Sequence, residues 1–202
     1  MKKLILILAL TFATSAVLAN TKTSSQHTEQ YDSIIDEFDA GKSTDAENFF
    51  RGVVEHVVRI EVLFRKIEIL DSIQSTPIGP FKTCIEDITA ESKSFKKILA
   101  KYEKPIFKYQ NAFMSLTHKW VDEIMYMINS HISSLIDFYI IPDAEWTDEQ
   151  IALYDFYAED YKVYAAIDDL WVIAQYTFAE KNGFELAEDE IDVDERIESE
   201  KE

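Results

Sequence analysis

The segment that decides the fold lies at residues 45–75 and reads DAENFFRGVVEHVVRIEVLFRKIEILDSIQS. Its apolar residues return every three or four positions, which is the spacing of one face of an α-helix. A broad apolar stripe consists of Phe49, Val53, Val57, Ile60, Phe64 and Ile67, and a smaller stripe on the other side consists of Val58, Val62 and Ile69. A helix with two apolar stripes contacts neighbours on two sides, so this segment predicts a helical bundle.

Four more helices are predicted from the same kind of pattern. The first is a short amphipathic helix and the others are longer; their ranges are residues 28–40, 81–101, 106–140 and 147–182. The chain has only four glycines and four prolines, and most of them fall between these segments. No run of alternating apolar and polar residues is long enough for a clear β-strand. We therefore expect an all-α protein, an antiparallel bundle of four to five helices.

Glycine, proline and one capping pair mark the expected helix ends. Residues 76–80 contain two prolines and a glycine and are predicted to form a tight connection. Pro105 is predicted to separate two helices, and a kink within one continuous helix is the alternative. Thr147 and Gln150 have the spacing of a capping box, and Gly183 is a typical C-terminal stop. The helix between them is apolar around most of its circumference, which predicts that it is the central element of the bundle.

Residues 1–19, MKKLILILALTFATSAVLA, have the pattern of a Sec signal peptide. Lys2 and Lys3 precede an apolar run that is too short to span a bilayer, and the segment ends in small residues that signal peptidase accepts. The mature chain is expected to begin at Asn20 and to leave the membrane after cleavage. We expect a periplasmic protein, with secretion as the alternative, in which residues 20–183 form the bundle domain.

The chain is strongly acidic, and most of the charge lies near its C-terminus. The formal charge is −18, and loss of the two leader lysines takes the mature chain to −20. Residues 184–202 contain ten acidic and two basic residues and few apolar ones, which predicts an acidic, disordered tail. Such a charge disfavours nucleic acid and anionic membranes and favours a basic protein or a cation as partner. Solubility or salt adaptation is the alternative explanation of the charge.

The last predicted helix carries a candidate partner-binding surface. Its exposed strip contains four acidic residues, namely Asp155, Glu159, Asp169 and Glu180. A dense negative surface accelerates encounter with a cationic protein. The first functional hypothesis is therefore a binding protein, for example an immunity protein or inhibitor that neutralises a cationic toxin or a wall-degrading enzyme.

A polar group among apolar residues gives a second hypothesis, a carrier of a small ligand. His131 falls in the middle of an apolar arc, and a buried imidazole needs hydrogen-bond partners. Asp160, Tyr164 and Asp168 lie on the aromatic side of the last helix, where either carboxylate could accept from a tyrosine or from His131. These four residues are a candidate ligand site, and the alternative is a structural layer that fixes the helix register.

A methionine and histidine group gives the metal version of the carrier hypothesis. Met114, His118, Asp122 and Met125 share one face of the helix at residues 106–140, and methionine with histidine can hold copper. The alternative is the ordinary edge of an apolar stripe.

Motifs of catalysis are absent from the sequence. There is no Glu-x-x-His pair, HExxH, paired cysteine, G-x-S-x-G or phosphate loop, so neither an enzyme nor a resident cofactor is predicted. The single cysteine, Cys84, lies beside apolar residues and is expected to be buried and inert. Glu55 with Arg59 and Glu61 with Arg65 have i, i+4 spacing and are predicted to be surface ion pairs.

Overall fold

The computed structural model describes residues 33–42, 44–72, 77–102, 104–137 and 146–186. The predicted signal peptide and residues 187–202 of the predicted tail lie outside the described residues. Within the described ranges the regular structure is entirely helical, which confirms the all-α prediction. None of these helices combines the length and the apolar character that a membrane crossing requires.

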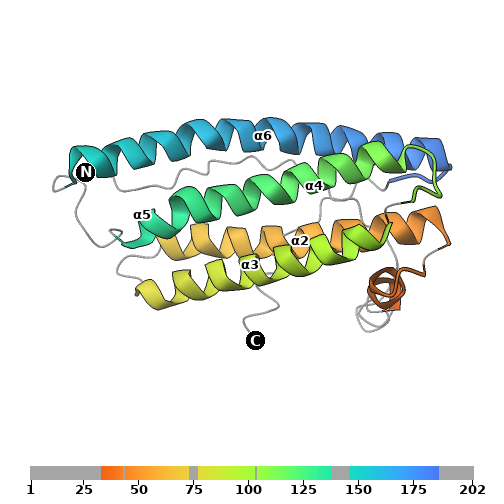
Figure 1. The fold of residues 1–202 in the computed structure, drawn as a ribbon, viewed down its shortest axis with the longest axis horizontal. Helices are drawn as coiled ribbons and strands as arrows, with labels where there is room; N and C mark the ends of the chain where they lie inside the picture. The colour runs from red at the N-terminus through yellow and green to blue at the C-terminus, as the bar shows by residue number, and fades with distance from the viewer. Residues whose placement is uncertain (1–32, 43, 73–76, 103, 138–145, 187–202) are drawn as a thin grey trace.

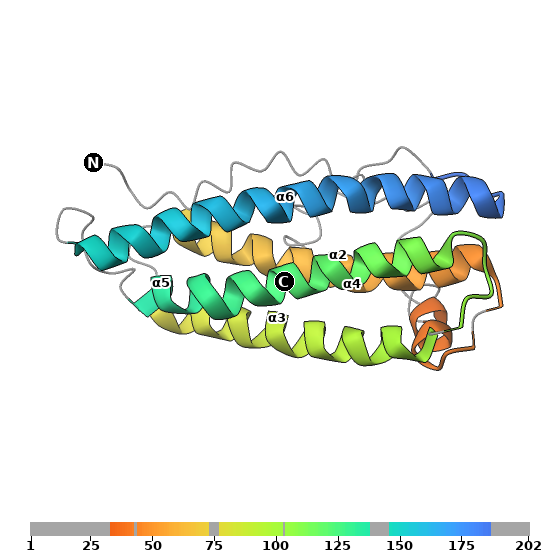
Figure 2. The same cartoon turned by 45° about the horizontal axis from the view of Figure 1, so that its top comes forward.

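Four long helical segments run alternately in opposite directions along one axis (Figure 1). They are α2 (Ala46–Ser72), α3 (Ile78–Leu99), α4 (Gln110–Met127) with its continuation α5 (Ser133–Asp137), and α6 (Asp148–Asn182). Along the chain each packs on the next, and α6 closes the ring by packing against α2. The same arrangement is visible in the turned view of Figure 2. The predicted antiparallel bundle is therefore confirmed.

Helix α2 supplies much of the core, as its two stripes predict. The whole broad stripe is buried, and Val58 and Val62 of the smaller stripe are buried as well. The helix begins where Asp45 caps it: Asp45 Oδ1 accepts hydrogen bonds from the backbone N–H groups of Glu47 and Asn48 at 2.8 and 3.0 Å. The capping residue Asp45 and the long apolar pattern therefore both indicate a helix that begins at Ala46.

A short helix at residues 33–39 covers one end of the bundle (Figures 1 and 2). Phe38 anchors it: its ring stacks on Tyr102 at a centroid distance of 4.9 Å, and the Tyr102 hydroxyl donates to the Phe38 carbonyl at 2.6 Å. Gly52 of α2 makes room for this contact, because a Cβ at Gly52 would lie 2.5 Å from Phe38 Cγ. The predicted helix at residues 28–40 is confirmed over its described part, and residues 28–32 lie outside it.

Helix α3 begins earlier than predicted. Pro77 is its N-cap residue, so that Ile78, Gly79 and Pro80 form the first turn although they were expected in the connection. Proline is tolerated there because the first N–H groups of a helix have no partner inside it. The prediction that residues 76–80 form a tight connection is therefore wrong for Ile78, Gly79 and Pro80, which are helical.

The predicted break at Pro105 is confirmed, but α4 begins only at Gln110. The Gln110 side chain holds the preceding turn: its Oε1 accepts from the N–H groups of Ile106 and Phe107 at 2.9 and 3.1 Å. Asn182 at the end of α6 ties down the same turn, because it exchanges two hydrogen bonds with the backbone of Lys108. These contacts connect the start of α4 to the end of α6.

A π turn at Ile128–Ile132 separates α4 from α5. Such a turn inserts one residue into a helix and rotates everything after it. The Ser133 hydroxyl donates to the Ile128 carbonyl at 2.8 Å across this turn. The turn matters for the site because His131 lies within it.

Helix α6 has the ends that the sequence predicts. Thr147 and Gln150 form a reciprocal capping box with N···O distances of 2.8 and 3.3 Å, and Gly183 ends the helix at a φ of 78°. Contacts with the bundle nevertheless continue past Gly183, because the Phe184 ring lies 5.5 Å from the Phe50 ring. Phe184 and Leu186, which were predicted to belong to the tail, pack against the core.

The prediction that α6 is the central element is wrong. In a ring of four helices none is central, and one side of α6 faces outward (Figure 2). Its core side carries Tyr157, Tyr164, Trp171 and Phe178, all buried. Its outer side carries Phe156, Val163, Leu170 and Ile173, all exposed. The helix is therefore apolar on two sides, as its sequence indicates, but only the core side packs against the rest of the described chain.

Candidate functional site

The four predicted partner-binding residues lie together on the outer side of α6. Asp155, Glu159, Asp169 and Glu180 are all exposed. Lys162 pairs with Glu159 at 2.6 Å, and Lys181 with Glu180 at 3.2 Å. Such exposed pairs contribute little to stability, so these side chains are able to exchange partners. The four carboxylates therefore lie on one exposed side of α6.

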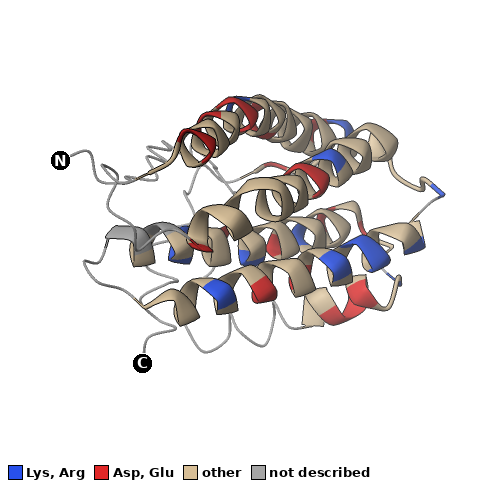
Figure 3. Ribbon diagram, turned by 60° about the vertical axis from the view of Figure 1, so that its left-hand side comes forward, with Lys and Arg blue, Asp and Glu red and all other residues tan. Residues whose placement is uncertain are grey.

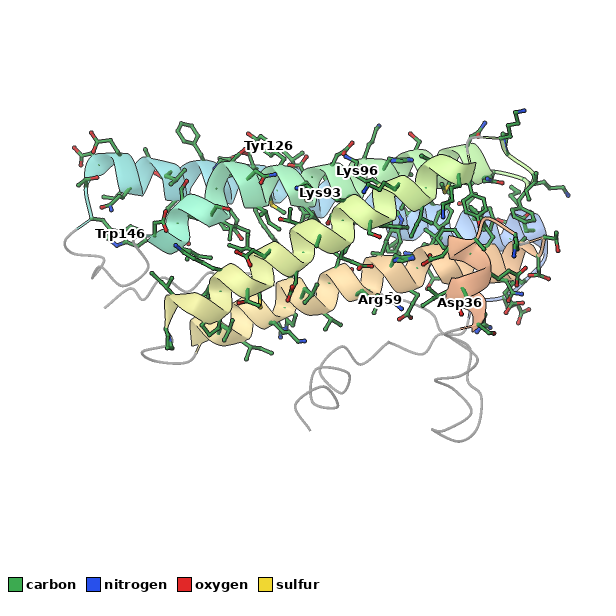
Figure 4. All side chains as sticks on the ribbon, turned by 60° about the horizontal axis from the view of Figure 1, so that its bottom comes forward. Asp36, Arg59, Lys93, Lys96, Tyr126 and Trp146 are labelled. Carbon is green, nitrogen blue, oxygen red and sulfur yellow. The ribbon has the colours of Figure 1, made fainter. Side chains whose placement is uncertain are left out.

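Charge is unequally distributed among the helices, as Figure 3 shows. Helix α6 contains eight acidic and two basic residues, whereas α3 contains three acidic and four basic residues. Two of the α3 lysines, Lys93 and Lys96, lie on the side of the bundle seen in Figure 4. The negative field of the described chain is therefore strongest on the α6 side.

The predicted ligand residues separate into two pairs. In the first pair, His131 Nε2 lies 2.7 Å from Asp160 Oδ2 and joins the π turn to α6. The imidazole is buried, while the carboxylate remains partly exposed. The Tyr126 ring meets the imidazole edge-on at 5.6 Å, and the charge of Asp160 raises the pKa of Tyr126. This pair opens to solvent and could bind a small polar group.

The second pair lies deeper in the bundle. Asp168 Oδ1 accepts from the indole N–H of Trp120 at 2.9 Å, and the buried Tyr164 ring lies 6.0 Å from Trp120. Burial raises the pKa of Asp168 to about 6, although the bond from Trp120 opposes the rise. The pKa of Tyr164 is raised well above its ordinary value. Burial is the main cause, and the charge of Asp168 adds to it. Both residues are core groups that join α4 to α6.

Glu61 of α2 belongs to the same buried layer. Burial raises its pKa well above the ordinary value, and the charge of Asp168 adds to the rise. Its Oε1 atom is buried without a hydrogen-bond partner among the described residues. The prediction of a surface ion pair is therefore wrong for Glu61, because the residue follows Val57 by four positions and faces the core. Glu55 is also buried, but it does face Arg59, with 3.7 Å between Oε1 and Nε.

The predicted metal group is only loosely assembled. Met114 is buried, His118 and Met125 are half-buried, and Asp122 is exposed. The Asp122 carboxylate is occupied by an ion pair with Lys96 of α3. Among the residues that the structure describes, no three His, Cys, Asp or Glu side chains are grouped closely enough to hold a metal ion. Cys84 is buried, as predicted, and burial raises the pKa of its thiol.

Sequence reasoning missed several buried polar residues, and one of them, His56, joins distant segments of the chain. Its Nδ1 lies 2.8 Å from Glu91 Oε1 of α3, and its Nε2 lies 2.9 Å from Asp39 Oδ1 at the end of the 33–39 helix. The signal was present, because His56 follows Phe49 by seven residues and therefore shares its apolar face. The imidazole clamps three helices together.

These features define the class of protein: an acidic four-helix bundle with buried polar contacts between helices and one mixed acidic and apolar face on α6. No family model matches the chain, and comparisons with curated proteins and with solved structures found no significant match.

Proposed function

We propose that the chain is an exported, acidic binding protein that captures a basic protein partner through the outer face of α6. The observation that carries this proposal is the row of four exposed carboxylates on that face, at Asp155, Glu159, Asp169 and Glu180. The field of α6 attracts a cationic surface and raises the rate of encounter. The leader places the encounter in the periplasm, or outside the cell if the protein is secreted.

The partner class follows from charge and compartment. A cationic toxin or a wall-degrading enzyme is a basic protein that acts in or beyond the periplasm, and an acidic immunity protein or inhibitor would neutralise it. Binding that depends on charge weakens as salt rises, because exposed charges are screened beyond about 10 Å at 0.1 M salt. Salt dependence is therefore the first property to measure.

The experiment is a pull-down from envelope extracts of the native cell and its competitors at low salt. The α6 variant combines Asp155→Asn, Glu159→Gln, Asp169→Asn and Glu180→Gln. A control variant removes the same charge elsewhere, through Asp36→Asn, Glu86→Gln, Asp87→Asn and Asp137→Asn, all at exposed positions. The wild type and the control should capture a basic protein that salt elutes, and the α6 variant should not. Empty beads from every extract, or equal capture by both variants, would count against the proposal.

A carrier of a small polar ligand is the second candidate function. The observation that favours it is His131 Nδ1, which is buried without a hydrogen-bond partner among the described residues. Native mass spectrometry of protein taken from its own periplasm would detect a bound ligand that His131→Gln releases. Elemental analysis of the same sample tests the metal version, with Met114→Leu and His118→Gln as variants. Protein that is empty in both measurements would eliminate this candidate.

A further inference from the structure

The outer face of α6 is apolar as well as acidic. Phe156, Val163, Leu170 and Ile173 have exposed fractions of 64, 49, 51 and 59%. They follow one another at intervals of seven, seven and three residues, so they form a single row along the helix, called here the outer stripe. At 1.5 Å per residue the outer stripe is about 25 Å long.

The outer stripe adjoins the packed side of α6, but its own side chains remain about half exposed or more. The buried residues of α6 include Tyr157, Tyr164 and Trp171, which repeat at seven-residue intervals one position after Phe156, Val163 and Leu170. The positions that directly follow these three buried residues, 158, 165 and 172, are half-buried. The packed side of the helix therefore extends from the buried residues in the direction away from the outer stripe. Large exposed apolar side chains in a continuous row are typical of an interaction surface.

Carboxylates border the outer stripe. Asp155 immediately precedes Phe156, Asp169 immediately precedes Leu170, and Glu159 lies about one turn after Phe156. Lys162 is the basic residue among them and pairs with Glu159. The face therefore combines an apolar centre with a net negative border, and a complementary surface has an apolar centre and a positive border.

We propose that the partner docks through a cationic amphipathic helix that lies lengthwise on α6. This inference rests on the proposed function and specifies the partner's chemistry. Apolar side chains of the docked helix, spaced by three and four residues, pack on the outer stripe, and its lysines or arginines face Asp155, Glu159 and Asp169. A second copy of this chain is a poorer occupant, because it would bring the carboxylates of two chains with a formal charge of −18 each into contact.

The test uses three synthetic peptides of equal length, about 25 Å when helical. The first has leucine at the heptad a and d positions and lysine elsewhere, the second has the same composition with the leucines scattered, and the third has glutamate in place of lysine. Fluorescence anisotropy gives the affinity of each peptide for the full chain, and circular dichroism reports helix formation. The first peptide should become helical and bind at least about tenfold more tightly than the second, and the third should not bind.

Matched variants locate the binding surface. Leu170→Ser and the double variant Val163→Ser with Leu170→Ser should weaken the first peptide by about tenfold or more, since they remove apolar contact. Ile106→Ser removes an apolar side chain of similar exposure, 62%, outside α6 and should leave the affinity unchanged. Melting curves of all variants verify that the bundle is intact, which exposed substitutions should not disturb.

The outcomes separate this inference from the proposed function. Equal, salt-sensitive binding of both lysine peptides, unaffected by Leu170→Ser, would overturn the amphipathic helix while leaving a basic partner in place. No binding of either lysine peptide would contradict both proposals. Sedimentation as a dimer that Val163→Ser with Leu170→Ser converts to a monomer would assign the outer stripe to a second copy and overturn the inference.

Discussion

At the scale of single residues, His56 is a buried polar group that joins three helices. Its two ring nitrogens lie 2.8 Å from Glu91 Oε1 and 2.9 Å from Asp39 Oδ1, so both polar atoms of the imidazole have a carboxylate partner. The bond from His56 lowers the pKa of Glu91, since it favours the ionised carboxylate. Folding therefore gains stability from Glu91 above the ordinary pKa of a glutamate, and this gain is lost as the pH falls through the lower, folded pKa.

The variant His56→Ala should destabilise the bundle by about 1–3 kcal/mol at neutral pH, less than a fully buried pair because both carboxylates reach solvent. Urea unfolding measures the loss. His118→Ala, at the half-exposed rim of α4, is the control and should stay within about 0.5 kcal/mol of the wild type. Equal losses of stability for the two variants would show that the contacts of His56 with Asp39 and Glu91 do not stabilise the bundle.

The buried carboxyl of Asp168 has the opposite pH dependence. Its folded pKa of about 6 exceeds the ordinary 3.8, so the folded chain binds this proton more tightly than the unfolded chain. The associated stability is present below about pH 4 and is lost as the pH rises to about 6. Burial of this charge therefore opposes folding at neutral pH.

Asp168→Asn keeps an oxygen acceptor for Trp120 and removes the buried charge. We expect it to stabilise the bundle by about 1–3 kcal/mol at pH 7, and this difference from the wild type should shrink as the pH falls to about 4. The neighbouring Asp169→Asn, at an exposed position, should change little at any pH. Denaturation at several pH values would reject this explanation if Asp168→Asn were less stable than the wild type throughout.

At the scale of elements, the contact between the 33–39 helix and α2 depends on the absence of one side chain. Alanine is the better helix former, so Gly52→Ala would ordinarily stabilise α2. Here its Cβ would lie 2.5 Å from Phe38 Cγ and 2.6 Å from Phe38 Cβ, which are too close to the backbone to move freely. We expect Gly52→Ala to destabilise the domain by about 1–3 kcal/mol and to expose the 33–39 helix to proteolysis.

Gly79 provides the matched control for this substitution. It also lies in a helix, but a Cβ there would meet no atom within 4 Å. Gly79→Ala should therefore remain within about 0.5 kcal/mol of the wild type. Similar behaviour of the two alanine variants would contradict the close approach of Phe38 to Gly52.

The helices themselves could be predicted because their signals are local. The two stripes of α2, the Thr147 capping box and the Gly183 stop each depend on residues within a few turns of one another. The π turn at Ile128–Ile132 could not be predicted, because a regular helical wheel has no position for an inserted residue. The hydrogen-bond partners of His131 and Asp168 could not be predicted either. Sequence spacing gives the direction in which a side chain leaves its helix, but it does not tell which other helix lies there.

At the scale of the whole molecule, the bundle and its acidity were predictable, and the exposed face of α6 was not. Apolar periodicity shows that one side of a helix is suited to burial, but it cannot show whether residues of the same chain pack against that side. For α6, helix α2 and the α4–α5 segment cover one side, and the outer stripe remains exposed. The second apolar side of α6, which led to the prediction of a central helix, is exposed, and it is therefore the candidate binding face.

Export is a further prediction at this scale. Protein isolated from the periplasm of its own cell should have the intact mass of a chain that begins at Asn20. Ala19→Arg should block cleavage, because signal peptidase requires a small residue at that position, and the leader should then be retained. Recovery of wild-type protein from the cytoplasm with residues 1–19 attached would contradict the proposed compartment and weaken the proposed partner class.

The π turn also has an evolutionary consequence. A π turn arises from the insertion of one residue into a regular helix, and here the rest of the bundle accommodates it within the α4–α5 segment. A chain of common descent that lacks this turn should therefore differ by a single-residue gap inside a helix, where gaps are ordinarily forbidden. Alignments that allow a gap between positions 128 and 132 would restore the correspondence of the residues beyond it.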